Sequence, residues 1–276
     1  MLQGVMLLWF IQVLVSVVFI AIDIRRTPES TVMKWGFVVV TLFLGPIGLV
    51  LYLLACREPL PGTHEQFVRP LWKQVVGSTM HCVAGDGIGI LVAAAVLTTI
   101  GVPAWLEIIG EYAVGFLFGW MVFQSLFMRG MAGGSYAKSL RSTLLPEFVS
   151  MNGVMAGMVA LSLPWRSALG ELATPAHPEF WFVMSLSLAL GFAVAFPLNW
   201  WLVSRGLKHG MMTVRRPRAT ATPMGAGAAP MDMGMDMEHA TMRMGAPVGT
   251  GTKAGMIGVS LAVLAAGVAI GVVLAG

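Results

Sequence analysis

The chain has 276 residues, of which 57% are hydrophobic and only 11% are charged. A soluble globular domain carries about 25% charged residues, so this composition excludes that class and indicates an all-α integral membrane protein. The formal net charge is +4, which we assign to loop residues facing anionic lipid. The lipid bilayer is therefore the expected partner, and no nucleic-acid partner is expected.

Seven apolar stretches are long enough to cross a bilayer, which takes about 20 residues each. The first has no basic n-region and no A-x-A cleavage site before Asp23, so we expect it to be retained as a helix. The seven predicted spans cover residues 2–22, 35–56, 75–100, 106–128, 147–164, 180–204 and 254–275.

These spans predict four parts of the chain. A two-helix membrane module (1–60) precedes a four-helix membrane core (70–210). A flexible Met-rich linker (211–253) follows, because its Pro, Gly, Ala and Thr residues cannot bury a core. A C-terminal transmembrane helix (254–276) ends the chain.

Lysine and arginine are divided unevenly between the loops. With a cytoplasmic N-terminus, 13 of them face inside and 4 face outside. The positive-inside rule then predicts a bacterial cytoplasmic-membrane protein with its N-terminus in the cytoplasm and its C-terminus outside. The first loop is the exception, because it places Arg25, Arg26 and Lys34 outside.

Pairs of glycines four residues apart occur in several spans, and such pairs let helices approach closely in lipid. We expect them to pack the helices of the bundle, or to form contact faces for a homo-oligomer or a membrane partner. The pairs are Gly85 and Gly89, Gly115 and Gly119, Gly153 and Gly157, and Gly267 and Gly271.

The third predicted span contains His81, Cys82 and Asp86, and ionisable groups in hydrocarbon are costly and usually functional. Cys82 and Asp86 are four residues apart and share a helix face, whereas His81 points about 100° away. Neighbouring His and Cys side chains therefore cannot easily form a hydrolytic dyad, and we predict no catalytic residue. A site here needs groups from the fifth and sixth spans at matching depth.

Polar residues of other spans fall at such a depth if a helix rises about 1.5 Å per residue, and nearly all of them lie in the inner half. Glu147 and Asp86 are predicted to be charge-compensating or proton-linked. The partners expected for Asp86 are His81, Arg205, Lys208 and His209. Gln124, Asn152 and Asn199 either line a polar interior or form hydrogen bonds that hold helices together.

Soft metal ligands accompany these groups. Met151, Met155 and Met158 form one stripe of the fifth span, and with Cys82 and His81 they offer the sulfur and nitrogen ligands that suit Cu(I). Ordinary core packing is the alternative for this stripe. His209 is a further candidate ligand.

The linker carries a second set of soft ligands, which predicts a segment that collects Cu(I). The alternative is a flexible tether whose methionines have no role in metal binding. The predicted topology places this segment in the cytosol, where thiols compete for Cu(I). The candidate ligands are Met231, Met233, Met235, Met237 and His239.

Three functions remain open. The leading one is binding or transport of a soft metal ion, with Cu(I) as the expected ion. A non-enzymatic scaffold whose polar residues join helices is the second, and a proton-coupled small-solute transporter using Asp86 and Glu147 is the third. No nucleotide is expected, and no haem either, because His81 is the one histidine inside a predicted span.

Two parts of the chain resemble known families. Asp23-Ile-Arg-Arg26, Trp35 and Leu44-Gly-Pro-Ile-Gly-Leu-Val-Leu-Tyr52 resemble the membrane module ahead of phospholipase D-type domains such as cardiolipin synthases. No HxK motif follows, so this resemblance implies an anchor alone. The His81-Cys82 motif with Gly85-Asp86, together with residues 147–158 and 197–210, resembles an uncharacterised bacterial membrane-protein family, which implies the bundle but no activity.

Overall fold

The computed structural model describes residues 2–128, 134–212 and 248–276, and these ranges are helical without any strand. Six helices in them are long and apolar enough to cross a membrane, so the predicted all-α membrane fold is confirmed. The spanning helices are α1 (Leu2–Asp23) continued by η1 (Ile24–Arg26), α5 (Leu71–Ile100), α6 (Ala104–Leu117) continued by η2 (Phe118–Gln124), α8 (Tyr136–Leu169) continued by η3 (Gly170–Ala173), α9 (Pro178–Ser204) and α10 (Thr250–Ala275). Short helices α4 (His64–Val68) and α7 (Ser125–Met128) connect them.

The predicted second span, residues 35–56, is wrong as a single helix. Two short helices, α2 (Thr31–Leu44) and α3 (Pro46–Ala55), replace it. The chain reverses at Gly45, whose φ is +54°, because Pro46 has no N–H to continue the helical ladder. A Cβ added at Gly48 would lie 2.8 Å from the Cα of Thr41, so the two helices pack against each other as an antiparallel hairpin.

This hairpin enters and leaves the bundle at the same end. Beyond α3, Arg57 Nε lies 2.9 Å from Asp23 Oδ2 at the end of α1, and the Tyr52 hydroxyl donates to the same carboxylate at 2.7 Å. Fourteen residues of helix reach about 21 Å, which is less than a bilayer core of about 30 Å. The hairpin therefore reaches into the bundle without crossing it.

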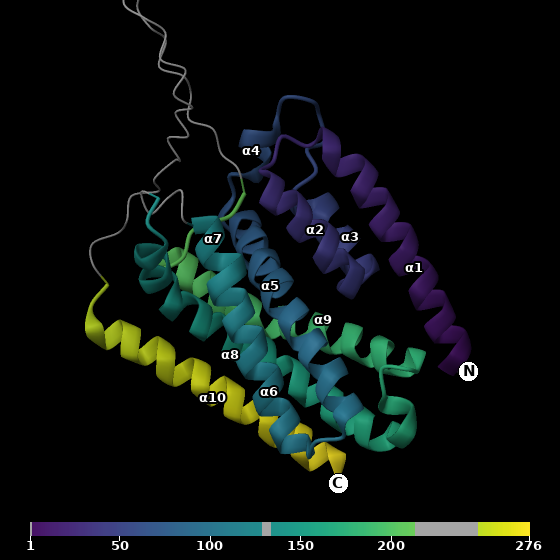
Figure 1. Cartoon of the computed structure of the whole chain (residues 1–276). Helices are drawn as coiled ribbons and strands as arrows, with labels where there is room; N and C mark the ends of the chain where they lie inside the picture. The colour runs from purple at the N-terminus through teal and green to yellow at the C-terminus, as the bar shows by residue number, and fades with distance from the viewer. Residues whose placement is uncertain (1, 129–133, 213–247) are drawn as a thin grey trace, which may run out of the picture.

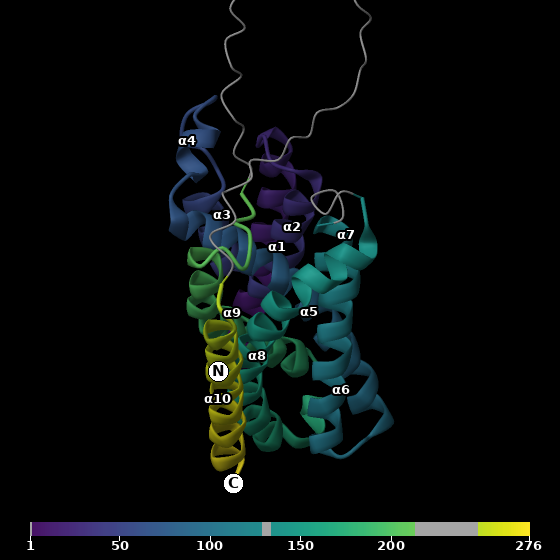
Figure 2. The same cartoon turned by 90° about the vertical axis from the view of Figure 1, so that its left-hand side faces the viewer.

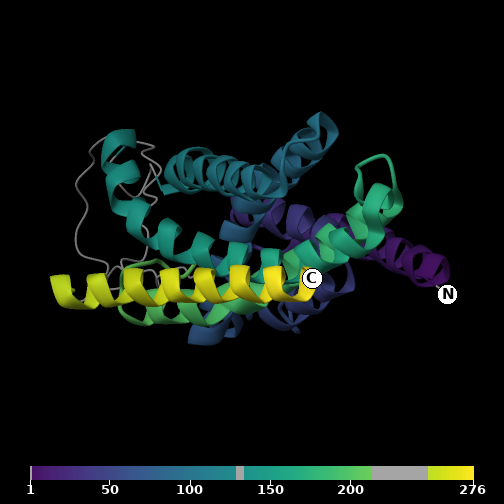
Figure 3. The ribbon, with the colours of Figure 1, turned by 90° about the horizontal axis from the view of Figure 1, so that it is seen from below.

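The two ends of the bundle differ sharply in charge. Helices α1 and α9 finish, and α5, α8 and α10 begin, at what we call the basic end, toward the upper left of Figure 1. Every described Lys and Arg except Arg166 lies at or near this end. The labelled N- and C-termini both lie toward the other end, as Figures 1 and 3 show.

Glycine contacts determine how closely the helices pack. Figure 2 shows α10 running along α8, where Cβ atoms added at Gly267 and Gly271 would lie less than 3 Å from backbone atoms of α8. Gly157 lies equally close to Gly191 of α9, and Gly89 to Gly115 of α6. A helix of the same chain thus covers each predicted glycine face.

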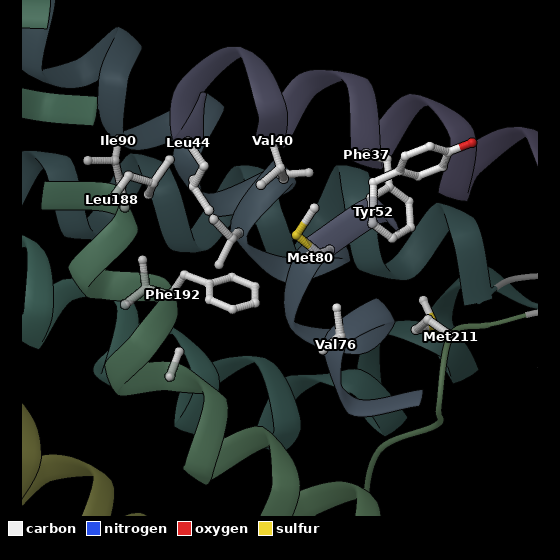
Figure 4. Packing of buried hydrophobic residues seen from close by; sticks show 14 of the residues in the cluster. Phe37, Val40, Leu44, Tyr52, Val76, Met80, Ile90, Leu188, Phe192 and Met211 are labelled. Carbon is white, nitrogen blue, oxygen red and sulfur yellow. The ribbon is translucent and has the colours of Figure 1, made fainter. Parts of the chain in front are cut away.

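The hairpin is fixed to the bundle by buried apolar side chains. Figure 4 shows Phe37, Val40 and Tyr52 of the hairpin beside Met80 of α5, with Leu188 of α9 in the same cluster. Lipid is as apolar as these side chains, so close packing rather than a hydrophobic driving force joins the helices. The hairpin and α9 thereby bury the face of α5 that carries Met80.

Candidate functional site

Side chains from α5, α8, α9 and the segment after α9 meet inside the bundle near the basic end. Cys82 donates to Glu147 Oε2 over 3.1 Å, and Lys208 Nζ lies 2.7 Å from Cys82 Sγ. Nζ also donates to Asn199 Oδ1 at 2.6 Å. None of these side chains is more than 4% exposed. We call Cys82, Asp86, Glu147, Asn199 and Lys208 the inner cluster.

Asp86 completes this cluster through Glu147. The two carboxyl groups lie within hydrogen-bonding reach of each other, and both border Gly119. A Cβ at position 119 would overlap Asp86 Oδ1 and lie 2.9 Å from Glu147 Oε1. Within the described residues, no N–H or hydroxyl group donates to either Asp86 oxygen. A carboxyl proton is thus the hydrogen that can join the two groups.

The backbone at Gly119 is itself unusual, because residues Phe118–Gln124 form a π-helix. Such segments are rare and often occur at functional sites, since they shift the side chains that follow. Here the π-helix continues α6 past the two carboxyl groups, and Gly119 leaves the space that they occupy. The combination of a glycine and a π-helix makes room for buried acid at this point.

Lys208 reaches the bundle interior because the chain turns back after α9. Gly206 has φ +69°, and the N–H groups of Leu207 and Lys208 both bond to the carbonyl of Leu202. Farther along, the Met212 N–H donates to Gln74 Oε1 on α5. These bonds hold the segment against α5, so that the side chain of Lys208 is buried rather than exposed like that of Arg205.

Charge balance constrains the protonation of the inner cluster. Burial alone lowers the pKa of the Lys208 ammonium, but the acidic groups of Cys82, Glu147 and Asp86 outweigh burial and raise this pKa above its ordinary value. One ammonium balances one carboxylate. Because adjacent carboxylates repel and are costly to bury, the neutral arrangement has one proton on the Asp86 and Glu147 pair.

The other polar residues predicted for this site serve different contacts. The His81 ring packs against Phe123 of the π-helix, with the two ring centroids 5.0 Å apart. Asn152 accepts from the Tyr112 hydroxyl at 2.7 Å and donates to Ser260 of α10 at 3.0 Å. Gln124 is buried at the end of the π-helix.

The predicted soft-metal ligands of α8 lie among apolar side chains. Met151, Met155 and Met158 are buried in the main apolar cluster, and His209 is half-buried next to Lys208. In the described part of the chain, no three His, Cys, Asp or Glu residues lie close enough together to hold a metal ion. The linker candidates Met231, Met233, Met235, Met237 and His239 lie outside the described residues.

A second cluster of ionisable side chains lies at the opposite end of the bundle, and it was not predicted from the sequence. Arg166 of α8 contacts Glu107 Oε1 at 2.6 Å and Glu111 Oε1 at 3.4 Å, and it donates to Thr98 at 2.8 Å. We call Thr98, Glu107, Glu111 and Arg166 the outer cluster. The prediction that nearly all intramembrane polar groups lie in the inner half is therefore wrong. Glu107 and Glu111, four residues apart in one span, were the available signal.

The comparisons with known proteins identify a family but no activity. Residues 71–208 match the family described as a domain of unknown function, DUF4396. The match starts at α5 and ends at Lys208, so it contains every residue of both clusters and excludes the two-helix module, whose resemblance to phospholipase D-type proteins stays a prediction. Neither the curated proteins nor the solved structures include a match. The chain belongs to this uncharacterised family, as its third to sixth predicted spans suggested.

Proposed function

We propose that this protein is a proton-linked transporter of the bacterial cytoplasmic membrane, in which Asp86 and Glu147 bind the transported proton. The observation that carries the proposal is a buried pair of carboxyl groups joined through Cys82 to a buried ammonium. Ionisable groups inside a bundle are costly and typically mark proton or ion pathways.

The connections within the inner cluster support this function. Lys208 donates to Cys82, Cys82 donates to Glu147, and Glu147 faces Asp86, so a change of protonation at the pair alters the charge balance of Lys208. A scaffold needs hydrogen bonds between helices, which Asn152 and Asn199 already provide. It has no need for two carboxyl groups in contact.

The basic end supports an orientation different from the sequence expectation. If the basic end faces the cytoplasm, Arg25, Arg26 and Lys34 join the other basic loop residues inside, and the exception of the first loop disappears. Both termini then lie outside. A cysteine placed at Gly4 and tested with a membrane-impermeant thiol reagent on intact cells distinguishes this orientation from a cytoplasmic N-terminus.

Proton movement in liposomes tests the proposed function. The purified full chain is reconstituted with a trapped pH-sensitive dye, and Na⁺, K⁺ or ammonium gradients are imposed in turn. We expect at least one gradient to drive proton movement, with a loss of about tenfold or more in Asp86→Asn and in Glu147→Gln. Glu171→Gln, an exposed acid, is the matched control. Proton movement equal to that of empty liposomes with every gradient, or undiminished in both variants, would overturn the proposal.

A soft metal ion such as Cu(I) is a second candidate for the transported species. One contact favours it: the Lys208 ammonium occupies the position between a thiol sulfur and an amide oxygen, where a monovalent metal cation would compete with it. Metal binding at Cys82 then requires Lys208 to leave, because its ammonium already occupies the position next to the sulfur.

This competition gives the metal hypothesis a specific test. Under reducing conditions, Lys208→Met should retain more Cu(I) or Ag(I) per chain than the wild type, and Lys208→Met combined with Cys82→Ser should lose that gain. Equal metal content in all three proteins would reject the metal hypothesis and leave the proton proposal standing.

A further inference from the structure

The outer cluster borders a cavity of about 390 Å³ at the end of the bundle away from the basic end. Its lining includes Thr98, Glu107, Glu111 and Arg166, with Ser162 of α8 beside them. Glu107 and Glu111 are 6% and 3% exposed, so both carboxyl groups are removed from bulk water although they line a cavity. The cavity thus has charged walls inside an apolar bundle.

The ion pairing in this cavity is incomplete. One guanidinium faces two carboxylates, and Arg166 lies at 2.6 Å from Glu107 but at 3.4 Å from Glu111. The hydrogen bond from Arg166 uses Glu111 Oε1, so the second carboxyl oxygen, Oε2, takes no part in that contact. Glu111 therefore shares its one basic partner with Glu107 and makes the longer of the two contacts, which favours binding of a proton or a cation at this carboxyl group.

Polar groups continue from this cavity toward the inner cluster. Tyr112 follows Glu111 on α6, and its hydroxyl donates to Asn152 of α8 at 2.7 Å. Along α6, Glu111 and Gly119 are eight residues apart, which is about 12 Å. Polar side chains at Glu111, Tyr112 and Asn152 thus continue from the cavity into the bundle, in the direction of Gly119 and the carboxyl pair.

We propose that this cavity is a cation-selective entry port through which protons or small monovalent cations reach Glu111. The proposal rests on the proton-linked function for its route to Asp86, but the selectivity of the cavity is independent of that route. Arg166 is the positioning residue, because it contacts Glu107 at 2.6 Å and Glu111 at 3.4 Å, which leaves Glu111 the more weakly held of the two acids.

Thiol labelling tests the port without any transport measurement. In a full chain with Cys56→Ala and Cys82→Ser, Ser162→Cys places one thiol on the cavity wall. We expect a cationic methanethiosulfonate to react at least about fivefold faster than an anionic one of similar size. Adding Glu107→Gln and Glu111→Gln should remove this preference. Leu172→Cys, at an exposed position at the same end, should show no preference in either background.

The outcomes separate the port from the proposed function. No reaction at position 162, or equal rates for the two reagents, would overturn the port even if proton transport is measured. Charge-selective labelling in a protein that moves no protons would leave the port in place and reject the transport proposal. If Ser162→Cys does not fold, Thr174→Cys on the same cavity serves in its place.

Discussion

The inner and outer clusters contain similar chemistry in different surroundings. Both join a basic side chain to two carboxyl groups, but the inner cluster is sealed, with Asp86 and Glu147 fully buried, whereas the outer one borders a cavity and leaves Arg166 17% exposed. Water can compensate a charge at the outer cluster, while the inner one must balance its charge internally. The same loss of a basic residue should therefore cost much more at the inner cluster.

Replacing the inner base gives the largest expected effect. Lys208→Met leaves the buried acids without their cation, so we expect the free energy of unfolding to fall by about 3–5 kcal/mol, measured by denaturant titration in detergent. Arg205→Met, an exposed neighbour, is the control and should change it by less than about 0.5 kcal/mol. Equal losses in the two variants would mean that the ammonium of Lys208 does not compensate the acids.

Filling the space at Gly119 gives the next largest effect. In Gly119→Ala the added Cβ overlaps Asp86 Oδ1, so we expect a loss of about 1–3 kcal/mol in the same titration. A Cβ at Gly258 of α10 meets nothing within 4 Å, which makes Gly258→Ala the matched control. If Gly119→Ala is as stable as this control, the carboxyl group of Asp86 does not lie where the structure places it.

Replacing Arg166, the basic residue of the outer cluster, should lower the stability least of the three substitutions. Arg166→Gln removes the partner of Glu107, but the cavity lets water solvate the acid, so we expect a loss of about 1–2 kcal/mol. A loss as large as that of Lys208→Met would show that the outer cluster is as tightly sealed as the inner one, and the comparison would fail.

The sequence predicted the inner cluster better than the outer one. Helical spacing put Cys82 and Asp86 on one face, and depth along the spans brought Glu147 and Asn199 to the same level. The partner of Cys82 was harder to predict from the sequence. The burial of Lys208 depends on the turn at Gly206 and on hydrogen bonds to Gln74, which is far away along the chain. Lys208 was one of four basic candidates predicted as partners of Asp86, and no basic partner was predicted for Cys82.

The errors have identifiable physical causes. Residues 35–56 have the length and apolarity of a span, and that outweighed the Gly45-Pro46 pair at which the helix breaks. Glu107 and Glu111 stand near the start of a predicted span, where acids are usually solvated, and only the distant Arg166 shows that they are buried and paired. The π-helix at Gly119 has no sequence pattern by which it could have been predicted.

The proton on the inner carboxyl pair can be measured directly. Infrared difference spectra of the purified full chain, wild type minus Asp86→Asn, report the carbonyl stretch of a protonated carboxyl group. We predict such a band at neutral pH, because in the variant Glu147 alone balances Lys208 without a proton. No band in this difference, and none in wild type minus Glu147→Gln, would contradict the account of a carboxyl pair that holds one proton.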